Sequence, residues 1–238
     1  YRTLRTNLEF FSLDHPLRSL LVTSASPEEG KSTTLANLAI TAAETGRKII
    51  LVDCDLRRPR LHELFGVEND AGLTTMMVAE HGLKQPPFQN TPVAGLSLLT
   101  SGPLPPNPAE LLASRRMAEV IEALVERADM VLFDAPPVIA VTDAIVLATR
   151  VDGVLLVVSA GSTRRDYVRQ AKSLLESEFI QRMAEQPTGN SLRRAVSLEV
   201  EPRLSNTGKF GDKASPDHWF LFAAPSAAPM VTAFLNGK

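Results

Sequence analysis

The sequence predicts an α/β protein built on a doubly wound, mainly parallel β-sheet with helices on both faces. Two observations support this prediction. Short apolar runs alternate along the chain with longer stretches of helical character, which is the pattern of parallel strands joined by helical crossovers. Several of the runs also lack polar alternation, as expected of strands that are covered on both faces.

The predicted elements follow one another from the N-terminal region to about residue 177. Asn107, Pro108 and Glu110 indicate a helix start, with the asparagine as N-cap and the proline at the first helical position. Gly46 indicates the end of the preceding long helix. The predicted strands are residues 19–23, 48–53, 96–100, 129–134 and 153–159, and the predicted helices are residues 31–45, 108–126, 143–150 and 163–177.

Charge, cysteine content and hydropathy exclude several classes of protein. The 238 residues include 25 Lys and Arg against 27 Asp and Glu, so nothing indicates a nucleic-acid partner. A single cysteine cannot form an internal disulfide, which favours a reducing compartment. No apolar run approaches the roughly 18 residues of a membrane-spanning helix. Because the chain starts at Tyr1 without a leader pattern, we expect a piece of a longer protein.

The strongest functional signal is a loop that follows the first predicted strand and opens a predicted helix. Residues 25–33 read Ala-Ser-Pro-Glu-Glu-Gly-Lys-Ser-Thr, close to the phosphate-loop pattern G-x₄-G-K-[ST] with Ala25 in place of the first glycine. Backbone N–H groups at a helix N-terminus can bind phosphate. Lys31 can reach the terminal phosphates and the Ser32 hydroxyl can bind Mg²⁺. The predicted triphosphate-binding residues are Ser26, Pro27, Glu28, Glu29, Gly30, Lys31, Ser32 and Thr33.

Carboxylates end two further predicted strands. Asp53 and Asp55 are two residues apart, a spacing that points both side chains the same way in an extended segment. Asp134 ends another apolar run. On its own the Asp-x-Asp pair is more typical of a turn or a helix cap, but the phosphate loop upstream favours a site for Mg²⁺ and proton transfer. Together the three signals predict a nucleoside triphosphate site of the P-loop NTPase type at one edge of the sheet.

The three motifs resemble the Walker A, A′ and B motifs of the bacterial tyrosine kinases (BY-kinases) of capsule and exopolysaccharide assembly. The matching segments are residues 25–33, 50–57 and 131–136, and the similarity covers residues 1–177. Asp-x-Asp-x-Arg in the A′ segment discriminates this family from generic P-loop ATPases. The resemblance implies phosphorylation of protein tyrosines, in trans between subunits, with ATP and Mg²⁺ as cofactors. It also implies control of polysaccharide polymerisation or export.

The resemblance carries residue roles over to this chain. Lys31 would hold the β- and γ-phosphates, and Asp53 would accept the proton of the incoming tyrosine hydroxyl. Arg57 matches the arginine of the A′ motif and completes the implied catalytic set. The implied ligands of Mg²⁺ are Ser32, Asp55 and Asp134.

The N-terminal stretch carries the implied assembly contacts. Arg2 and Arg5 match two arginines of the helix through which family members contact the next subunit, which implies a ring-like homo-oligomer. The other implied partner is a membrane polysaccharide co-polymerase or activator, on the same or a separate chain. The implied location is the cytoplasm, at the inner face of the cell membrane. Phe10 and Phe11 close this amphipathic stretch and are predicted to be core contacts.

Two features depart from the family pattern. Glu28 stands where a glycine is usual, which predicts a stiffer and more acidic phosphate loop. Residues 178–238 show neither the usual further strand nor clustered tyrosines, and we expect a diverged, partly disordered or irregular segment. The domain division predicted from the sequence is therefore a catalytic domain at 1–177 and this segment at 178–238.

The diverged segment is expected to leave the sheet one strand short. The apolar patches at residues 219–225 and 229–235 contain proline, so at most residues 231–235 are predicted to pair, at an edge. Residues 186–215 are expected to be loosely ordered. Since the sequence holds only Tyr1 and Tyr167, self-phosphorylation is expected to be weak.

Two other functions stay open at the level of sequence. A MinD- or ParA-like ATPase switch shares the predicted sheet, but that group carries a lysine four residues before the loop glycine, where this chain has Ser26. A catalytically impaired scaffold of the same fold is the other alternative, in which the altered C-terminal region prevents productive ATP binding.

Overall fold

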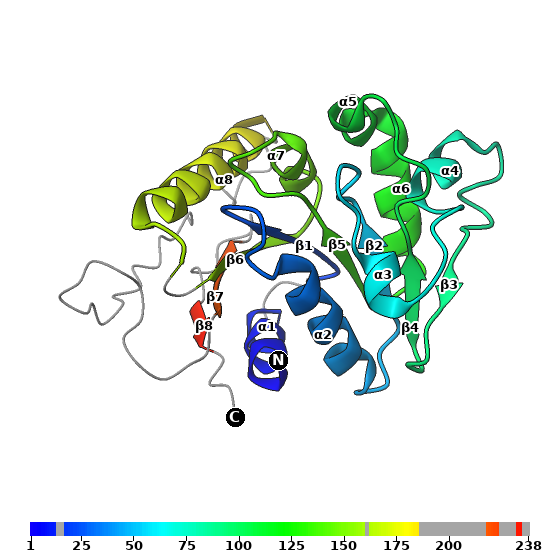
Figure 1. The fold of residues 1–238 in the computed structure, drawn as a ribbon, viewed down its shortest axis with the longest axis horizontal. Helices are drawn as coiled ribbons and strands as arrows, with labels where there is room; N and C mark the ends of the chain where they lie inside the picture. Colours follow the sequence, from blue (N-terminus) through cyan, green and yellow to red (C-terminus); the bar gives the residue numbers. More distant parts are fainter. Residues whose placement is uncertain (13–16, 160–161, 186–217, 224–231, 235–238) are drawn as a thin grey trace.

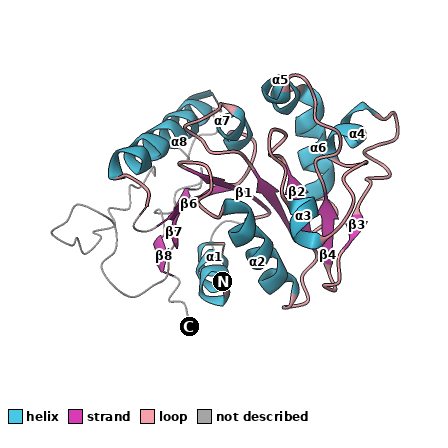
Figure 2. Ribbon diagram, viewed as in Figure 1, coloured by secondary structure: helices cyan, strands magenta, loops and turns pink. Residues whose placement is uncertain are grey.

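The computed structural model describes residues 1–12, 17–159, 162–185, 218–223 and 232–234. Its centre is a single sheet with the strand order β3-β4-β2-β5-β1-β6-β7-β8, and helices lie on both sides of the strands (Figures 1 and 2). The described helices are too short or too polar to traverse a bilayer. The elements in chain order are α1 (Arg2–Phe11), β1 (Ser19–Ser24), α2 (Lys31–Ala43), β2 (Ile49–Asp53), α3 (Leu61–Phe65), α4 (Leu73–Val78), β3 (Gln89–Asn90), β4 (Leu96–Leu99), α5 (Pro108–Ala113), α6 (Arg115–Val125), β5 (Met130–Asp134), α7 (Asp143–Ala148), β6 (Gly153–Ser159), α8 (Arg165–Glu185), β7 (His218–Ala223) and β8 (Thr232–Phe234).

The predicted fold class is confirmed. The five strands β4, β2, β5, β1 and β6 run parallel to one another, and antiparallel strands flank them at both ends of the sheet. Every residue of β1, β2 and β5 is buried. That burial explains why these runs lack polar alternation, because helices cover both of their faces.

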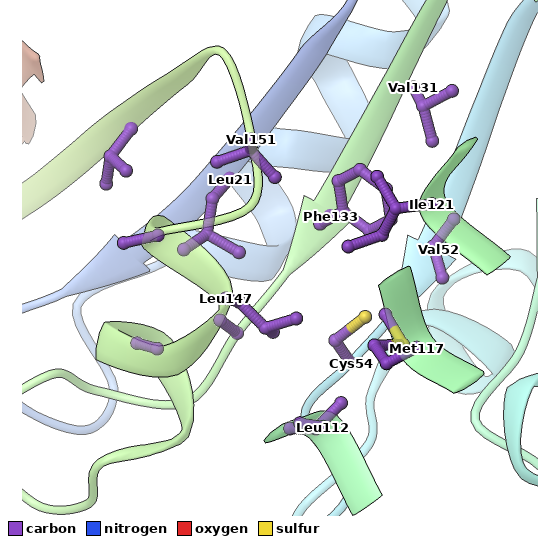
Figure 3. Close-up of a cluster of buried hydrophobic side chains, with 14 of the residues drawn as sticks. Leu21, Val52, Cys54, Leu112, Met117, Ile121, Val131, Phe133, Leu147 and Val151 are labelled. Atoms are coloured by element: carbon purple, nitrogen blue, oxygen red, sulfur yellow. The ribbon is translucent and has the colours of Figure 1, made fainter. Parts of the chain in front are cut away.

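Two apolar clusters fill the space between the sheet and its two helical layers. One packs α1 and α2 against one face, through residues such as Leu4 and Leu38. The other packs α6, α7 and α8 against the opposite face. Figure 3 shows this second cluster, with the fully buried Phe133 of β5 among Leu21 and Ile121. The two clusters pack the central strands from both sides. They thereby fix the carboxyl ends of these strands, where the polar residues of the predicted motifs lie.

Most predicted boundaries agree with the structure. Each of the five predicted strands is present, with ends that differ by at most one residue. The helix predicted at 108–126 is instead divided at Ser114, whose backbone is extended and whose hydroxyl accepts a hydrogen bond from Met117 N at 3.2 Å. Serine is a favourable N-cap, so it ends α5 and starts α6. The short helices α3 and α4 were not predicted.

The expectations for the C-terminal segment are wrong in two respects. Helix α8 continues to Glu185, beyond the helix end predicted at residue 177. Strand β7 pairs with the whole length of β6 except Gly153, and β8 pairs with β7. The outer edge of β6 is therefore covered. The paired residues are 218–223 and 232–234, and neither range includes the prolines of the two patches, at 225 and 229. Residues 186–215 lie outside the described part of the chain.

The predicted core role of Phe10 is also wrong, because its side chain is 66% exposed. Helix α1 buries Leu4 and Leu8, which are four residues apart and share one helix face. Phe10 is two residues further on and lies on another face. The side chain of Phe11 lies outside the described part of the structure.

A chain that ends before residue 218 is expected to associate more strongly than the 238-residue chain. Without β7, the outer row of N–H and C=O groups on β6 is unpaired and can pair with another copy. Sedimentation velocity over a range of concentrations compares the two chains. A shortened chain that associates no more than the 238-residue chain would contradict the pairing of β7 with β6.

Candidate nucleotide-binding site

The predicted site residues meet at the carboxyl ends of β1, β2 and β5. In the register of the sheet, Asp53 of β2 lies opposite Asp134 of β5, and Val22 of β1 lies on the other side of Asp134. The predicted phosphate loop leaves the end of β1 and enters α2 at Lys31. The parallel strands therefore bring the three predicted motifs together at one edge.

The phosphate loop has an unusual backbone at two positions. Gly30 is the N-cap residue of α2 and has φ +78°, while Glu28 has φ +63°. Glycine adopts this left-handed region without steric cost, whereas a residue with a side chain loses roughly 1–2 kcal/mol. The usual glycine at position 28 is thus explained by the conformation of the loop, and Glu28 adopts that conformation under strain.

Lys31 is the centre of a buried charge cluster. Its Nζ lies 2.9 Å from Asp55 Oδ2 and 3.2 Å from Asp134 Oδ1, and it donates to Ser32 Oγ at 3.2 Å. The Ser32 hydroxyl in turn donates to Asp134 Oδ2. Burial lowers the pKa of Lys31, but the charges of Asp134 and Asp55 outweigh it and the pKa is raised. Lys31 is therefore a cation here, held by two carboxylates.

Asp53 anchors the turn that follows β2. Its Oδ2 accepts hydrogen bonds from Arg60 N at 3.1 Å and Leu61 N at 3.0 Å, and its Oδ1 accepts one from Asp55 N at 3.2 Å. Burial, assisted by the charge of Asp134, raises the pKa of Asp53 to about 7. Burial likewise raises the pKa of Asp134. Asp53 is fully buried and does not line the cleft described below.

Arg57 is held by a residue that the sequence did not single out. Its Nε and Nη2 donate to the two carboxylate oxygens of Asp143 at 2.9 and 3.0 Å. Asp143 is fully buried at the start of α7, and its hydrogen bonds raise the pKa of Arg57. The Arg57 side chain is 41% exposed. A buried carboxylate thus fixes the direction of a guanidinium that faces the site.

A cleft of about 560 Å³ opens over this edge. One wall comes from the phosphate loop, a second from the turn and α3 after β2, and a third from the loop between β5 and α7. Of the predicted loop residues, Ser26 and Glu29 do not line it. The lining residues are Pro27, Glu28, Gly30, Lys31, Ser32, Thr33, Asp55, Arg57, Arg58, Arg60, Glu63, Leu64, Pro136, Pro137, Ala140 and Val141.

The oxygen atoms around Lys31 could supply some of the ligands of Mg²⁺, but not a complete set. The Ser32 hydroxyl and the Asp55 and Asp134 carboxylates are hard oxygen ligands of the kind that Mg²⁺ prefers. Within the described residues, however, no three acidic, His or Cys side chains are arranged to hold a metal alone. Mg²⁺ in nucleotide sites is commonly bound by one or two carboxylates together with phosphates. The site therefore fits a metal that arrives with a triphosphate.

Comparison with known proteins agrees with this geometry. A family model described as the CobQ/CobB/MinD/ParA nucleotide binding domain matches residues 20–183, so the chain belongs to that class of P-loop nucleotide-binding domains. Tyrosine-protein kinase YwqD of Bacillus subtilis is 47% identical over 175 residues, which are 74% of this chain and 73% of YwqD. Putative tyrosine-protein kinase CapB of Staphylococcus aureus is 37% identical over 175 residues, 74% of this chain and 76% of CapB.

A solved structure places the chain in the same group. The kinase domain of the Escherichia coli tyrosine kinase ETK superposes with a TM-score of 0.68 at 33% identity, covering 74% of this chain and 68% of that domain. The chain belongs to the bacterial tyrosine kinases.

The free energy of unfolding of the metal-free chain is expected to fall as the pH rises from about 4 to about 7. The pKa of Asp53 is about 7 in the fold, against about 3.9 when unfolded. Between these values the folded chain binds more protons, so rising pH destabilises it. In Asp53→Asn this decline should be shallower, by up to about 1.4 kcal/mol per pH unit.

Urea unfolding at a series of pH values, with a chelator present, measures these slopes. Asp70→Asn, which replaces an exposed carboxyl outside the site, is the matched control. Equal slopes in Asp53→Asn and Asp70→Asn would show that the carboxyl of Asp53 does not titrate in this range.

Proposed function

We propose that the chain transfers the γ-phosphoryl group of ATP to protein tyrosines and thereby regulates the polymerisation or export of a capsular or extracellular polysaccharide. The placement of the A′ motif carries this proposal. Asp53 ends a strand that pairs directly with the strand of Asp134, and Asp55 follows it two residues later. Lys31 of the phosphate loop bonds to Asp55 and Asp134. Membership of the bacterial tyrosine kinases supports tyrosine as the acceptor.

The proposed reaction depends on positioning and charge neutralisation more than on covalent chemistry. Lys31 exchanges its carboxylate partners for the terminal phosphates, and the loop N–H groups at the start of α2 bind phosphate oxygens. Ser32, Asp55 and Asp134 would then hold Mg²⁺, which would supply positive charge against the phosphates. Arg57, fixed by Asp143, points its guanidinium at the cleft.

Asp53 is proposed as the group that accepts the proton of the tyrosine hydroxyl. A pKa of about 7 suits a general base that works near neutral pH. Its carboxylate is bound to the turn that carries Asp55 and Arg60, so access to an acceptor requires that this turn shifts. We therefore expect the turn after β2 to have one conformation when the tyrosine acceptor is bound and another when it is not.

The proposed assembly uses α1, at the cytoplasmic face of the membrane and next to a polysaccharide co-polymerase or activator. Arg2 is exposed and available to another subunit. Arg5 is already engaged within its own subunit, because its Nη1 donates to Thr41 O at 3.2 Å and its Nε lies 3.5 Å from Glu9 Oε1. Of the two arginines, Arg2 is therefore the stronger candidate for a ring contact.

The main test follows radiolabelled ATP, and Lys31→Met is expected to abolish all transfer and hydrolysis. Loss of the ammonium removes the phosphate contact and leaves Asp55 and Asp134 unpaired. Purified protein is incubated with Mg·ATP and a tyrosine-rich peptide, and label is counted on tyrosine and as free phosphate. Lys48→Met is the control and should label normally. Lys48 is exposed and lies just before the start of β2, at the end of the strands opposite the site. Unchanged turnover in Lys31→Met would contradict the assignment of the phosphate loop.

The same experiment separates the alternatives. Label on tyrosine supports the kinase. Free phosphate without labelled tyrosine supports the MinD- or ParA-like switch, a reading that the shared nucleotide-binding domain favours. If neither labelled tyrosine nor free phosphate forms, the result supports a scaffold that has lost its catalytic activity.

Asp53→Asn and Asp55→Asn are expected to fail in different ways. Asp53→Asn should lose phosphoryl transfer and still bind Mg·ATP, because its amide cannot accept the tyrosine proton. Asp55→Asn should weaken the binding of Mg·ATP about tenfold or more, because a ligand of the metal is lost. Calorimetric titration measures both affinities, with Asp70→Asn as the control. Equal affinity losses in the two variants would show that the roles are not separable.

A further inference from the structure

The side chain of Glu29 turns away from the cleft and into the fold. Glu29 precedes Gly30 in the phosphate loop, is 4% exposed and does not line the cleft. Its Oε2 accepts a hydrogen bond from Ser26 N at 3.0 Å, which ties the beginning of the loop to its end. A carboxylate in such a position is stable only when its oxygens are hydrogen-bonded.

Thr163 supplies a second hydrogen bond to Glu29 from a distant part of the chain. Its hydroxyl donates to Glu29 Oε1 and accepts a hydrogen bond from Ser159 N at 3.2 Å. The N–H group of Thr163 also donates to Ser159 O at 3.0 Å, so Thr163 is bound to the last residue of β6 through both its backbone and its side chain. Thr163 is 9% exposed. One hydroxyl, used as donor and acceptor at once, therefore joins the end of β6 to the phosphate loop.

The anchored side chain lies between two left-handed residues. Glu28 on one side has φ +63° and Gly30 on the other has φ +78°. Strain at a residue such as Glu28 persists only where the surroundings hold the backbone in place. The hydrogen bonds from Ser26 N and from the Thr163 hydroxyl to the Glu29 carboxylate help to hold this stretch. The N–H groups of the stretch lead into the start of α2, where a phosphate would bind.

We propose that Thr163 is a positioning residue of the nucleotide site. Its hydroxyl holds Glu29, and Glu29 keeps the phosphate loop in its anion-binding conformation against the strain at Glu28. The inference rests on the proposed nucleotide-binding function and extends that site to Thr163, two residues before the start of α8.

Thr163→Val tests the inference, because it keeps the shape of the side chain and removes the hydroxyl. We expect the Kd for Mg·ATP, measured by calorimetry, to rise about tenfold, the usual scale for losing a hydrogen bond to a charged group. Thr163→Ser keeps the hydroxyl and should bind within about twofold of the unsubstituted chain. Thr149→Val is the matched control, because the Thr149 hydroxyl donates to Val146 O at the end of α7, away from the cleft.

Two further measurements distinguish positioning from a general loss of structure. Combining Thr163→Val with Glu29→Gln should cost no more affinity than the more harmful single change, since both break the same connection. Adding Glu28→Gly to Thr163→Val should recover part of the affinity, because glycine adopts the loop conformation without strain. Additive losses, or no recovery, would overturn the positioning role.

Binding is measured without any tyrosine acceptor, so the result is independent of the transfer reaction. Equal affinity of the unsubstituted chain and Thr163→Val would overturn the inference. Tight binding by the unsubstituted chain without tyrosine labelling, together with a weakened Thr163→Val, would support the inference and overturn the proposed kinase reaction. Absence of binding by the unsubstituted chain would overturn both.

Discussion

The balance of charge around Lys31 is the interaction on which the nucleotide site depends. Asp134 is fully buried and Asp55 nearly so, and a buried carboxylate without a partner costs several kcal/mol. The ammonium of Lys31 satisfies both at 2.9 and 3.2 Å. A nucleotide with its metal brings one negative and one positive partner to the same place. The ammonium of Lys31 and the carboxylates of Asp55 and Asp134, which pair with one another, are thus also the groups that could pair with the phosphates and with the metal.

The parallel sheet makes this cluster possible. Asp53 of β2 and Asp134 of β5 lie opposite one another. Because side chains alternate between the two faces of a strand, a shift of one residue between these strands would place the two aspartates on opposite faces of the sheet. The apolar clusters on both sides of the sheet prevent such a shift, since they bury every residue of both strands. The packing of residues that have no chemical role, such as Phe133, therefore sets the distances between those that have one.

Local sequence patterns predicted much of this structure, but they could not predict contacts between segments that are distant in the sequence. The apolar runs located the parallel strands, and the loop that contains Lys31 located the site. The pairing of Arg57 with Asp143 joins segments that no local spacing connects. Strand β7 was missed for a related reason. A proline at 225 argues against a strand across the whole apolar patch, but the strand ends at Ala223, before this proline. The prediction for Phe10 failed because an amphipathic stretch does not by itself show which helix face is buried. The buried face carries Leu4 and Leu8, and Phe10 lies on another face.

The pairing of β7 with β6 also affects the order in which the chain can fold. The contacts among β1, β2, β4, β5 and β6 involve residues 19–159, all of which leave the ribosome before β7 is made. The last antiparallel ladder must then bring residues 218–223 back to 154–159, and closing so long a loop costs entropy before any contact forms. During synthesis the nucleotide-binding edge is thus complete while the far edge of the sheet is still open. In that interval β6 is the surface that a chaperone or a neighbouring nascent chain would meet first.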